Sequence, residues 1–166
     1  MPSKSLALWQ DSTADDIEPW LLEGLKAGCE YFEMKTGIIS KVVDNRYIIR
    51  AVYSTMGDIF SPGMEFELQN TYCEAVIQKK DFISYLQVGK IPTMVLHPVY
   101  VAVQLESYMG VPLYNNKQID GTLNFSSFQV REQAFSSDEI ALIKSMGEKI
   151  ESVIYPEQNA DTSSTN

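Results

Sequence analysis

Apolar positions return every three or four residues in the first part of the chain. Between Asp11 and Met34, Leu21, Leu25 and Phe32 keep this spacing, which is typical of an amphipathic helix with one buried face. Polar residues with a preference for helix N-caps occupy positions 11–13 at the start of this segment. The pattern therefore predicts a helix that begins near these positions.

A different pattern follows, rich in β-branched and aromatic residues. The segments 36–44 and 46–55 read TGIISKVVD and RYIIRAVYST, a composition that favours strands. Asp44 and Asn45 connect them, and both residue types tolerate the positive φ of a tight hairpin turn. A third short strand is predicted at 81–86.

The segment 105–127 reads as a longer hairpin. Residues 108–114 show little alternation, which suits a strand in the interior of a sheet, and residues 118–127 alternate cleanly. The alternation predicts one face that packs inward and one that meets water or a ligand. The first face carries Ile119, Gly121, Leu123 and Phe125, and the second carries Asp120, Thr122, Asn124 and Ser126.

Two further helices complete the pattern, at 69–80 and 136–154. The second opens with Ser136 and Glu139 at capping-box spacing. The segment 87–104 contains prolines and a glycine and is predicted to be a loop with a short helical turn after Pro98. The order of elements predicts an α+β fold, with helices packed on an antiparallel sheet.

The chain organises as one domain, with residues 13–154 between a flexible leader (1–12) and a disordered polar tail (155–166). Its 166 residues suffice for a sizeable core. The formal net charge of −9 disfavours nucleic acid as a partner, because an acidic surface repels phosphates. The sequence lacks a long apolar run and a secretory signal, which predicts a cytoplasmic protein that does not enter a membrane.

Candidate chemistry is sparse. The chain has two cysteines, Cys29 and Cys73, and a single histidine, His97. These offer too few ligands for a zinc site, and neither cysteine has the electropositive surroundings of a reactive thiol. We expect both cysteines to be reduced and slow to react.

The second half of the chain resembles the GAF domain family. The segments SYMGVPLYNNKQIDGTLNFSS and QAFSSDEIALIKSMGEKIESVI are similar to that family's C-terminal hairpin and final helix. The resemblance implies a six-stranded antiparallel sheet. Helices from both ends of the chain pack on one face, and loops and short helices cover a small-molecule pocket on the other.

The resemblance also implies where that pocket lies. We expect the apolar loop 88–104, through Ile91, Met94, Val95 and Val99, to fold over the polar face of the hairpin strand. A cover of that kind over a partly polar floor encloses a typical ligand site. The predicted ligand-binding residues are His97, Tyr108, Tyr85, Tyr100, Thr122 and Asn124.

Known branches of the family bind bilins, bind cyclic nucleotides or reduce free methionine sulfoxide. Leu96 stands where bilin-binding members have a cysteine before the histidine, the asparagine-lysine motif of the cyclic-nucleotide branch is missing, and no activated cysteine is visible. We therefore expect a non-enzymatic sensory or regulatory domain. The alternatives are a ligand-free dimerisation module and, less favoured, a reductase of free methionine sulfoxide.

The expected partners are an unidentified small molecule, a second copy of the chain and a separate signalling protein. The homodimer is predicted to use surplus apolar surface on the last helix together with Trp20 and Leu21. No cofactor is assigned.

Overall fold

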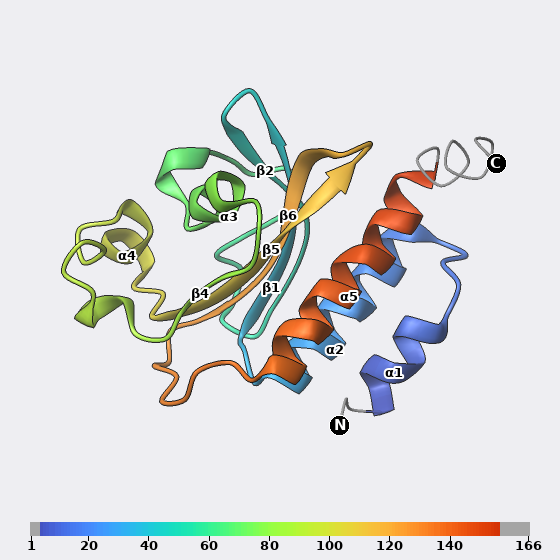
Figure 1. Ribbon diagram of the computed structural model, residues 1–166, viewed down its shortest axis with the longest axis horizontal. Helices are drawn as coiled ribbons and strands as arrows, with labels where there is room; N and C mark the ends of the chain where they lie inside the picture. The colour runs from blue at the N-terminus through green and yellow to red at the C-terminus, as the bar shows by residue number, and fades with distance from the viewer. Residues whose placement is uncertain (1–3, 157–166) are drawn as a thin grey trace.

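The protein folds as a six-stranded antiparallel sheet with helices on both faces (Figure 1). The computed structural model describes residues 4–156. The strand order across the sheet is β3-β2-β1-β6-β5-β4. In chain order the elements are α1 (Lys4–Asp11), α2 (Ile17–Phe32), β1 (Thr36–Val43), β2 (Arg46–Ser54), β3 (Glu65–Glu67), η1 (Leu68–Asn70), α3 (Cys73–Lys79), β4 (Ile83–Tyr85), η2 (Val88–Lys90), α4 (Pro98–Val103), β5 (Ser107–Asn115), β6 (Gln118–Ser127) and α5 (Ser137–Ile154).

One face of the sheet, called here the helix face, carries α2 and α5 side by side (Figure 1). The fully buried Leu123 and Phe125 of β6 belong to its core cluster, together with Leu25, Ile143 and Met146 from the two helices. From Gly121 to Ser126, every other residue of β6 points to this face, as predicted. A register shift against β5 at Asp120 breaks the alternation before Gly121, so Ile119 does not share a face with Leu123 as predicted.

The opposite face, called here the pocket face, is covered by α3, α4 and the loops between them (Figure 1). Its cluster contains Val88, Met94 and Val99 from the segment 88–104. That part of the loop therefore folds back over the sheet as predicted. Ile91 and Val95 are partly exposed and do not join the cluster.

The predicted hairpin turn and the predicted cap of α5 are both found, whereas the predicted start of the first long helix is wrong. Asp44 and Asn45 both have positive φ, at 48° and 64°, and join β1 to β2 as a tight hairpin. Ser136 caps α5 with both hydrogen bonds of the capping box to Glu139. The long helix at the start, in contrast, begins at Ile17 with Asp16 as its N-cap residue, not at positions 11–13.

The predicted flexible leader is wrong for residues 4–11, which form α1. This helix packs on α2 with Leu6 and Trp9 buried. The Trp9 ring stacks on Trp20 with 4.6 Å between ring centroids, and Trp9 Nε1 donates to the Trp20 carbonyl. Gly24 makes room for the Trp9 ring, because a Cβ there would overlap it.

This packing also changes the predicted dimer surface. Trp20 is 4% exposed and Leu21 is fully buried, so both residues lie inside the fold and are not free for a second copy. The sequence pattern misplaced them because it treated the helix that covers Trp20 as a loose leader. Of the predicted tail, positions 157–166 lie outside the described residues.

Candidate functional site

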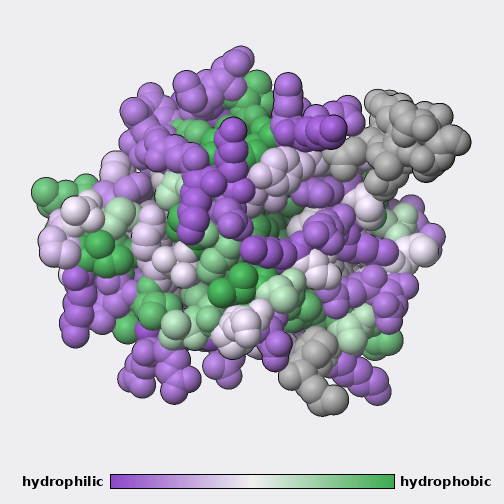
Figure 2. Space-filling view, viewed as in Figure 1, coloured by the Kyte–Doolittle hydropathy of each residue, from purple (hydrophilic) through white to green (hydrophobic). Residues whose placement is uncertain are grey.

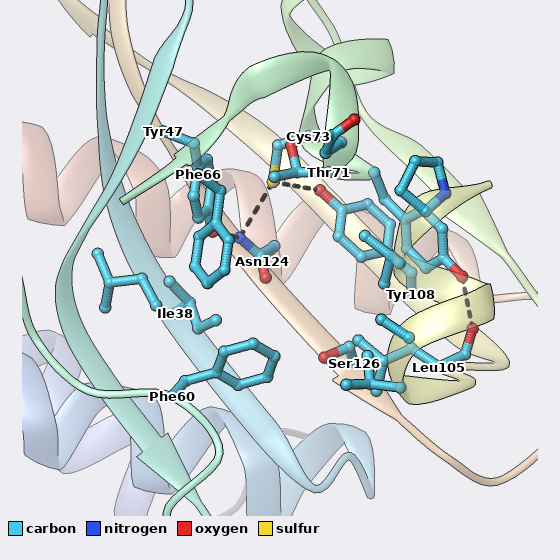
Figure 3. A pocket seen from close by; sticks show the side chains of 17 residues that line it. Ile38, Tyr47, Phe60, Phe66, Thr71, Cys73, Leu105, Tyr108, Asn124 and Ser126 are labelled. Carbon is cyan, nitrogen blue, oxygen red and sulfur yellow. Dashed lines mark hydrogen bonds between the residues drawn. The ribbon is translucent and has the colours of Figure 1, made fainter. Parts of the chain in front are cut away.

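A cavity of about 240 Å³ opens on the pocket face, between the sheet and its covering segments. Strands β1, β2, β5 and β6 supply the floor, and α3, α4 and the segment before β3 supply the walls (Figure 3). Its lining is mostly apolar and aromatic, with a few polar side chains. The lining residues are Ile38, Tyr47, Ile49, Phe60, Phe66, Asn70, Thr71, Tyr72, Cys73, Pro98, Val99, Ala102, Val103, Leu105, Tyr108, Asn124 and Ser126.

Aromatic rings face the cavity from two sides. In Figure 3, Phe60 and Phe66 lie on the β2 side, and Tyr108 lies opposite, on the side of α3 and β5. The ring of Tyr72 meets that of Tyr108 edge to face, with 5.5 Å between centroids. The Tyr72 hydroxyl donates to the Leu105 carbonyl at 2.8 Å, which fixes this wall against the segment leading into β5.

The polar end of the cavity is a network centred on the thiol of Cys73, at the first turn of α3. The Cys73 sulfur accepts hydrogen bonds from Thr122 Oγ1 at 3.4 Å and from Asn124 Nδ2 at 3.3 Å. It also lies 3.0 Å from the Tyr108 hydroxyl. Asn124 Nδ2 reaches the Tyr47 hydroxyl at 3.1 Å. Residues from β2, α3, β5 and β6 therefore converge on one point.

The network satisfies groups that burial would otherwise penalise. Thr122 has no exposed surface and lies beneath the cavity, where its Oγ1 is 2.6 Å from Ser40 Oγ on β1. Alternation along β6 brings Thr122 and Asn124 to the same face. The polar stripe of β6 is thus held by side chains from neighbouring strands and from α3.

Burial controls the ionisation of the polar end. Desolvation raises the pKa of Cys73, and hydrogen bonds from Thr122, Tyr108 and Tyr47 offset this rise only in part. Desolvation likewise raises the pKa of Tyr47 and of Tyr108 well above the ordinary value. All three groups are therefore neutral near pH 7, and the thiol is a weak nucleophile.

The structure brings two of the six predicted site residues into the cavity lining, Tyr108 and Asn124. Thr122 supports Asn124 from beneath. Tyr85 lies behind the lining, with its ring 6.0 Å from that of Tyr108. Tyr100 points to Glu106, to which its hydroxyl donates at 3.2 Å.

His97 does not line the cavity, which corrects its expected place at the polar end. Its Nδ1 accepts a hydrogen bond from the Val99 amide at 3.2 Å and caps α4. Its ring packs on Tyr72, with 4.9 Å between centroids. Partial burial lowers the pKa of His97, although Glu74 and the Thr71 backbone act in the opposite direction.

The sequence reasoning about ligands missed four residues of the cavity lining: Tyr47, Phe60, Phe66 and Cys73. Tyr47 could have been found, because it lies on a strand whose alternate residues are apolar. Cys73 lies in the first turn of α3, within the helix predicted at 69–80, but spacing along the chain does not show that this turn forms a cavity wall.

No group of three or more His, Cys, Asp or Glu side chains that could hold a metal ion occurs among residues 4–156. No helix within the same range is long and apolar enough to cross a membrane.

The cavity lining offers neutral hydrogen-bonding groups and aromatic faces, which can hold a small organic molecule.

Comparisons with known proteins agree with this architecture. A family model for the GAF domain matches residues 25–154. No curated protein matches the sequence.

Solved structures match along most of the chain. The GAF domain of an Acinetobacter phosphoenolpyruvate-protein phosphotransferase superposes with a TM-score of 0.70 at 16% identity, covering 91% of this chain and 88% of that one. A free methionine-R-sulfoxide reductase from Neisseria meningitidis, in complex with its substrate, has a TM-score of 0.73 at 14% identity, covering 95% and 90%. A phycocyanobilin-bound GAF domain from a cyanobacterial phytochrome has a TM-score of 0.66 at 14% identity, covering 85% of each chain. At these identities the likeness shows the fold.

Proposed function

The chain belongs to the GAF domain family, and we propose that it is a sensory or regulatory domain that binds a small molecule and catalyses no reaction on it. The observation that carries this proposal is the cavity of about 240 Å³ on the pocket face. Ligand sites typically combine mostly apolar walls with a few convergent polar groups. The network around Cys73 and Asn124 supplies those polar groups at one end.

The neighbours in the fold support a binding role. One of them is bound to phycocyanobilin and another is in complex with its substrate. The identity of the ligand does not transfer at this sequence distance. What transfers to the proposal is that a GAF sheet with loops over one face can hold a small molecule.

A reductase of free methionine sulfoxide is the second candidate, because Cys73 lines the cavity. Two observations weigh against it. The pKa of Cys73 is raised by burial, which suppresses the thiolate needed for attack. Cys29 belongs to the core of the helix face, so the sheet separates it from Cys73 and it cannot act as a resolving thiol without rearrangement.

A second copy of the chain and a separate signalling protein are further parts of the proposal. The last helix, α5, stays part of the proposed homodimer surface, because its Leu142 and Val153 are only partly buried. Trp20 and Leu21 are buried, so the matching surface on α1 and α2 would consist of the exposed apolar side chains Leu8, Ile17 and Leu22. Sedimentation velocity at micromolar concentrations tests this, and a monomer at every concentration would exclude the homodimer. The cytoplasmic location also stays a prediction.

Native mass spectrometry of the purified protein, combined with a pair of variants on α4, tests the binding function. Ala102 lines the cavity, whereas Val101 is 64% exposed and does not line it. Ala102→Trp should place its ring in the cavity and abolish retention of a small molecule. Val101→Trp adds the same side chain outside the cavity and should leave retention intact. Equal retention by both variants would contradict binding in this cavity.

A further inference from the structure

The size of the cavity limits the ligand. A cavity of 150 Å³ accepts benzene, so by simple scaling the 240 Å³ found here holds roughly ten non-hydrogen atoms. A molecule of this size has one fused ring system or a ring with a short substituent. A linear tetrapyrrole or a nucleotide is too large for the cavity in this form.

The charge of the cavity limits the ligand further. Within the described residues, its lining contains no Asp, Glu, Lys, Arg or His. The titratable groups that do face it, Cys73 and the tyrosines at 47, 72 and 108, stay neutral near pH 7 because burial raises each pKa. A buried ion without a partner is strongly disfavoured, and the net charge of −9 additionally repels anions.

The aromatic walls favour a flat molecule. Phe60 and Phe66 stand on one side of the space and Tyr108 on the other (Figure 3), with Tyr47 and Tyr72 completing the aromatic lining. Rings placed on two sides of a slot pack well on the faces and edges of a planar guest.

The hydrogen bonds of Asn124 define what the guest should present. Among residues 4–156, the side-chain hydrogen bonds of Asn124 start from its amide nitrogen, which donates towards Tyr47, Cys73 and Thr122. In Figure 3 the oxygen of the same amide points away from Cys73, into the space bordered by Ile38, Phe60 and Ser126. The oxygen is an acceptor, so a guest gains a hydrogen bond there by offering an N–H or O–H group.

We infer that the cavity selects an uncharged, flat molecule of roughly ten non-hydrogen atoms that donates one hydrogen bond to the side-chain oxygen of Asn124. This ligand class rests on the proposed binding function. It differs in kind from the bilin and from the free amino acid named for the two neighbours, since an amino acid carries two charges that this lining does not pair.

Calorimetric titration of the full chain with a graded set of probes tests the inference. Indole fits the predicted size, is neutral and has one N–H donor. The probe 1-methylindole keeps the ring and removes the donor, and indole-3-acetate keeps the donor and adds a negative charge. Indole should bind about tenfold more tightly than 1-methylindole, the factor expected for one buried hydrogen bond. Indole-3-acetate should bind more weakly than indole.

The Asn124→Leu variant sharpens the test, because leucine has a similar volume and no acceptor. The preference for indole over 1-methylindole should fall to about one in this variant. Near-ultraviolet circular dichroism checks that the variant is folded. If it is not, the comparison of the three probes on the unaltered protein still tests the inference. Ala102→Trp should abolish indole binding, and Val101→Trp should preserve it.

The outcomes separate the ligand class from the binding function. Equal affinity for indole and 1-methylindole, or tighter binding of indole-3-acetate, would overturn the ligand class. Failure of all three probes, together with a retained charged compound that Ala102→Trp excludes, would overturn the ligand class and support the binding function. Failure of all probes with no retained compound would overturn the binding function itself.

Discussion

The two faces of the sheet are built on opposite principles from the same strands. On the helix face, β6 contributes Leu123 and Phe125 to a continuous apolar core. On the pocket face, the same strand contributes Thr122 and Asn124 to a hydrogen-bonded network with a cavity beside it. The first face is filled by apolar side chains from the sheet and two helices, and the second keeps space and polarity. Neighbouring residues of one strand therefore serve the apolar core on one face and the proposed ligand site on the other.

The helices that cover the two faces of the sheet also differ in how deeply their side chains are buried. Figure 2 shows apolar side chains gathered over the region of α4, which covers the cavity. Leu96, just before this helix, is 84% exposed, and Val101, within it, is 64% exposed. The helix α4 contains no buried residue, whereas α2 and α5 each bury several.

The largest effect is expected from Phe125→Ala on the helix face. Phe125 is fully buried, so its truncation leaves a cavity and should lower the free energy of unfolding by about 3 to 5 kcal/mol. Phe128→Ala is the matched control, because Phe128 is 42% exposed and should cost about 0.5 kcal/mol or less. Urea denaturation measures the free energy of unfolding of both variants. A similar loss in the two would contradict the tight packing described for Phe125 on the helix face.

A second prediction compares two helical glycines that face the same side of the sheet. A Cβ on Gly28 would overlap the Phe125 ring, whereas a Cβ on Gly147 would meet its nearest neighbour at 3.5 Å, an ordinary contact. Gly28→Ala should therefore destabilise by about 1 to 3 kcal/mol. Gly147→Ala should stabilise by up to about 1 kcal/mol through helix propensity. If both variants change the free energy of unfolding in the same direction, the difference in packing around the two glycines is contradicted.

A third prediction concerns pH and the buried Cys29 of α2. Burial raises the pKa of Cys29 from 9.0 to about 12, so the folded thiol stays protonated while the unfolded thiol ionises above pH 9. Its contribution to stability is complete below pH 9 and is lost as the pH rises towards 12. At pH 10 the loss should be about 1 kcal/mol. The stability of Cys29→Ala should fall less steeply between pH 8 and 10 than that of the unaltered chain, and parallel curves would contradict this assignment.

The smallest effect is expected from His97→Ala on the pocket face. The variant loses the hydrogen bond to the Val99 amide that caps α4 and should cost about 0.5 to 1 kcal/mol. His97→Asn should restore most of this, because asparagine is a good N-cap residue. Indole affinity should change less in either variant than in Ala102→Trp. A loss in His97→Ala as large as in Ala102→Trp would place the imidazole in the site.

Local patterns in the sequence predicted the sheet and its turns because each rests on nearby residues. Asp44 and Asn45 specify their turn by backbone preference, and Ser136 and Glu139 specify a helix start by mutual hydrogen bonds. Local patterns indicated five of the six strands, and the residues of β3 were not predicted. The expectation of a six-stranded antiparallel sheet came from the family resemblance, and that of a polar floor came from the alternation within residues 118–127. The sheet and its polar floor are as predicted, whereas the order of the strands was not predicted.

The rest depended on contacts distant in sequence. The helix α1 has only eight residues, and such a short segment depends on tertiary packing for its stability. The helical spacing of Leu6 and Trp9 was the available signal. The orientation of His97 depended on a cap inside a loop, and the role of Cys73 depended on meeting Tyr108 and Asn124 from other strands. The spacing of residues along the chain does not predict such contacts between distant residues.

The stack of Trp9 on Trp20 has a consequence for spectroscopy. These are the only two tryptophans in the chain, they lie with ring centroids 4.6 Å apart, and neither lines the cavity. The intrinsic tryptophan emission of the protein is therefore a reporter of one event, the docking of α1 on α2. A titration followed by this emission will register a ligand only when binding on the pocket face is transmitted through the sheet to the first helix.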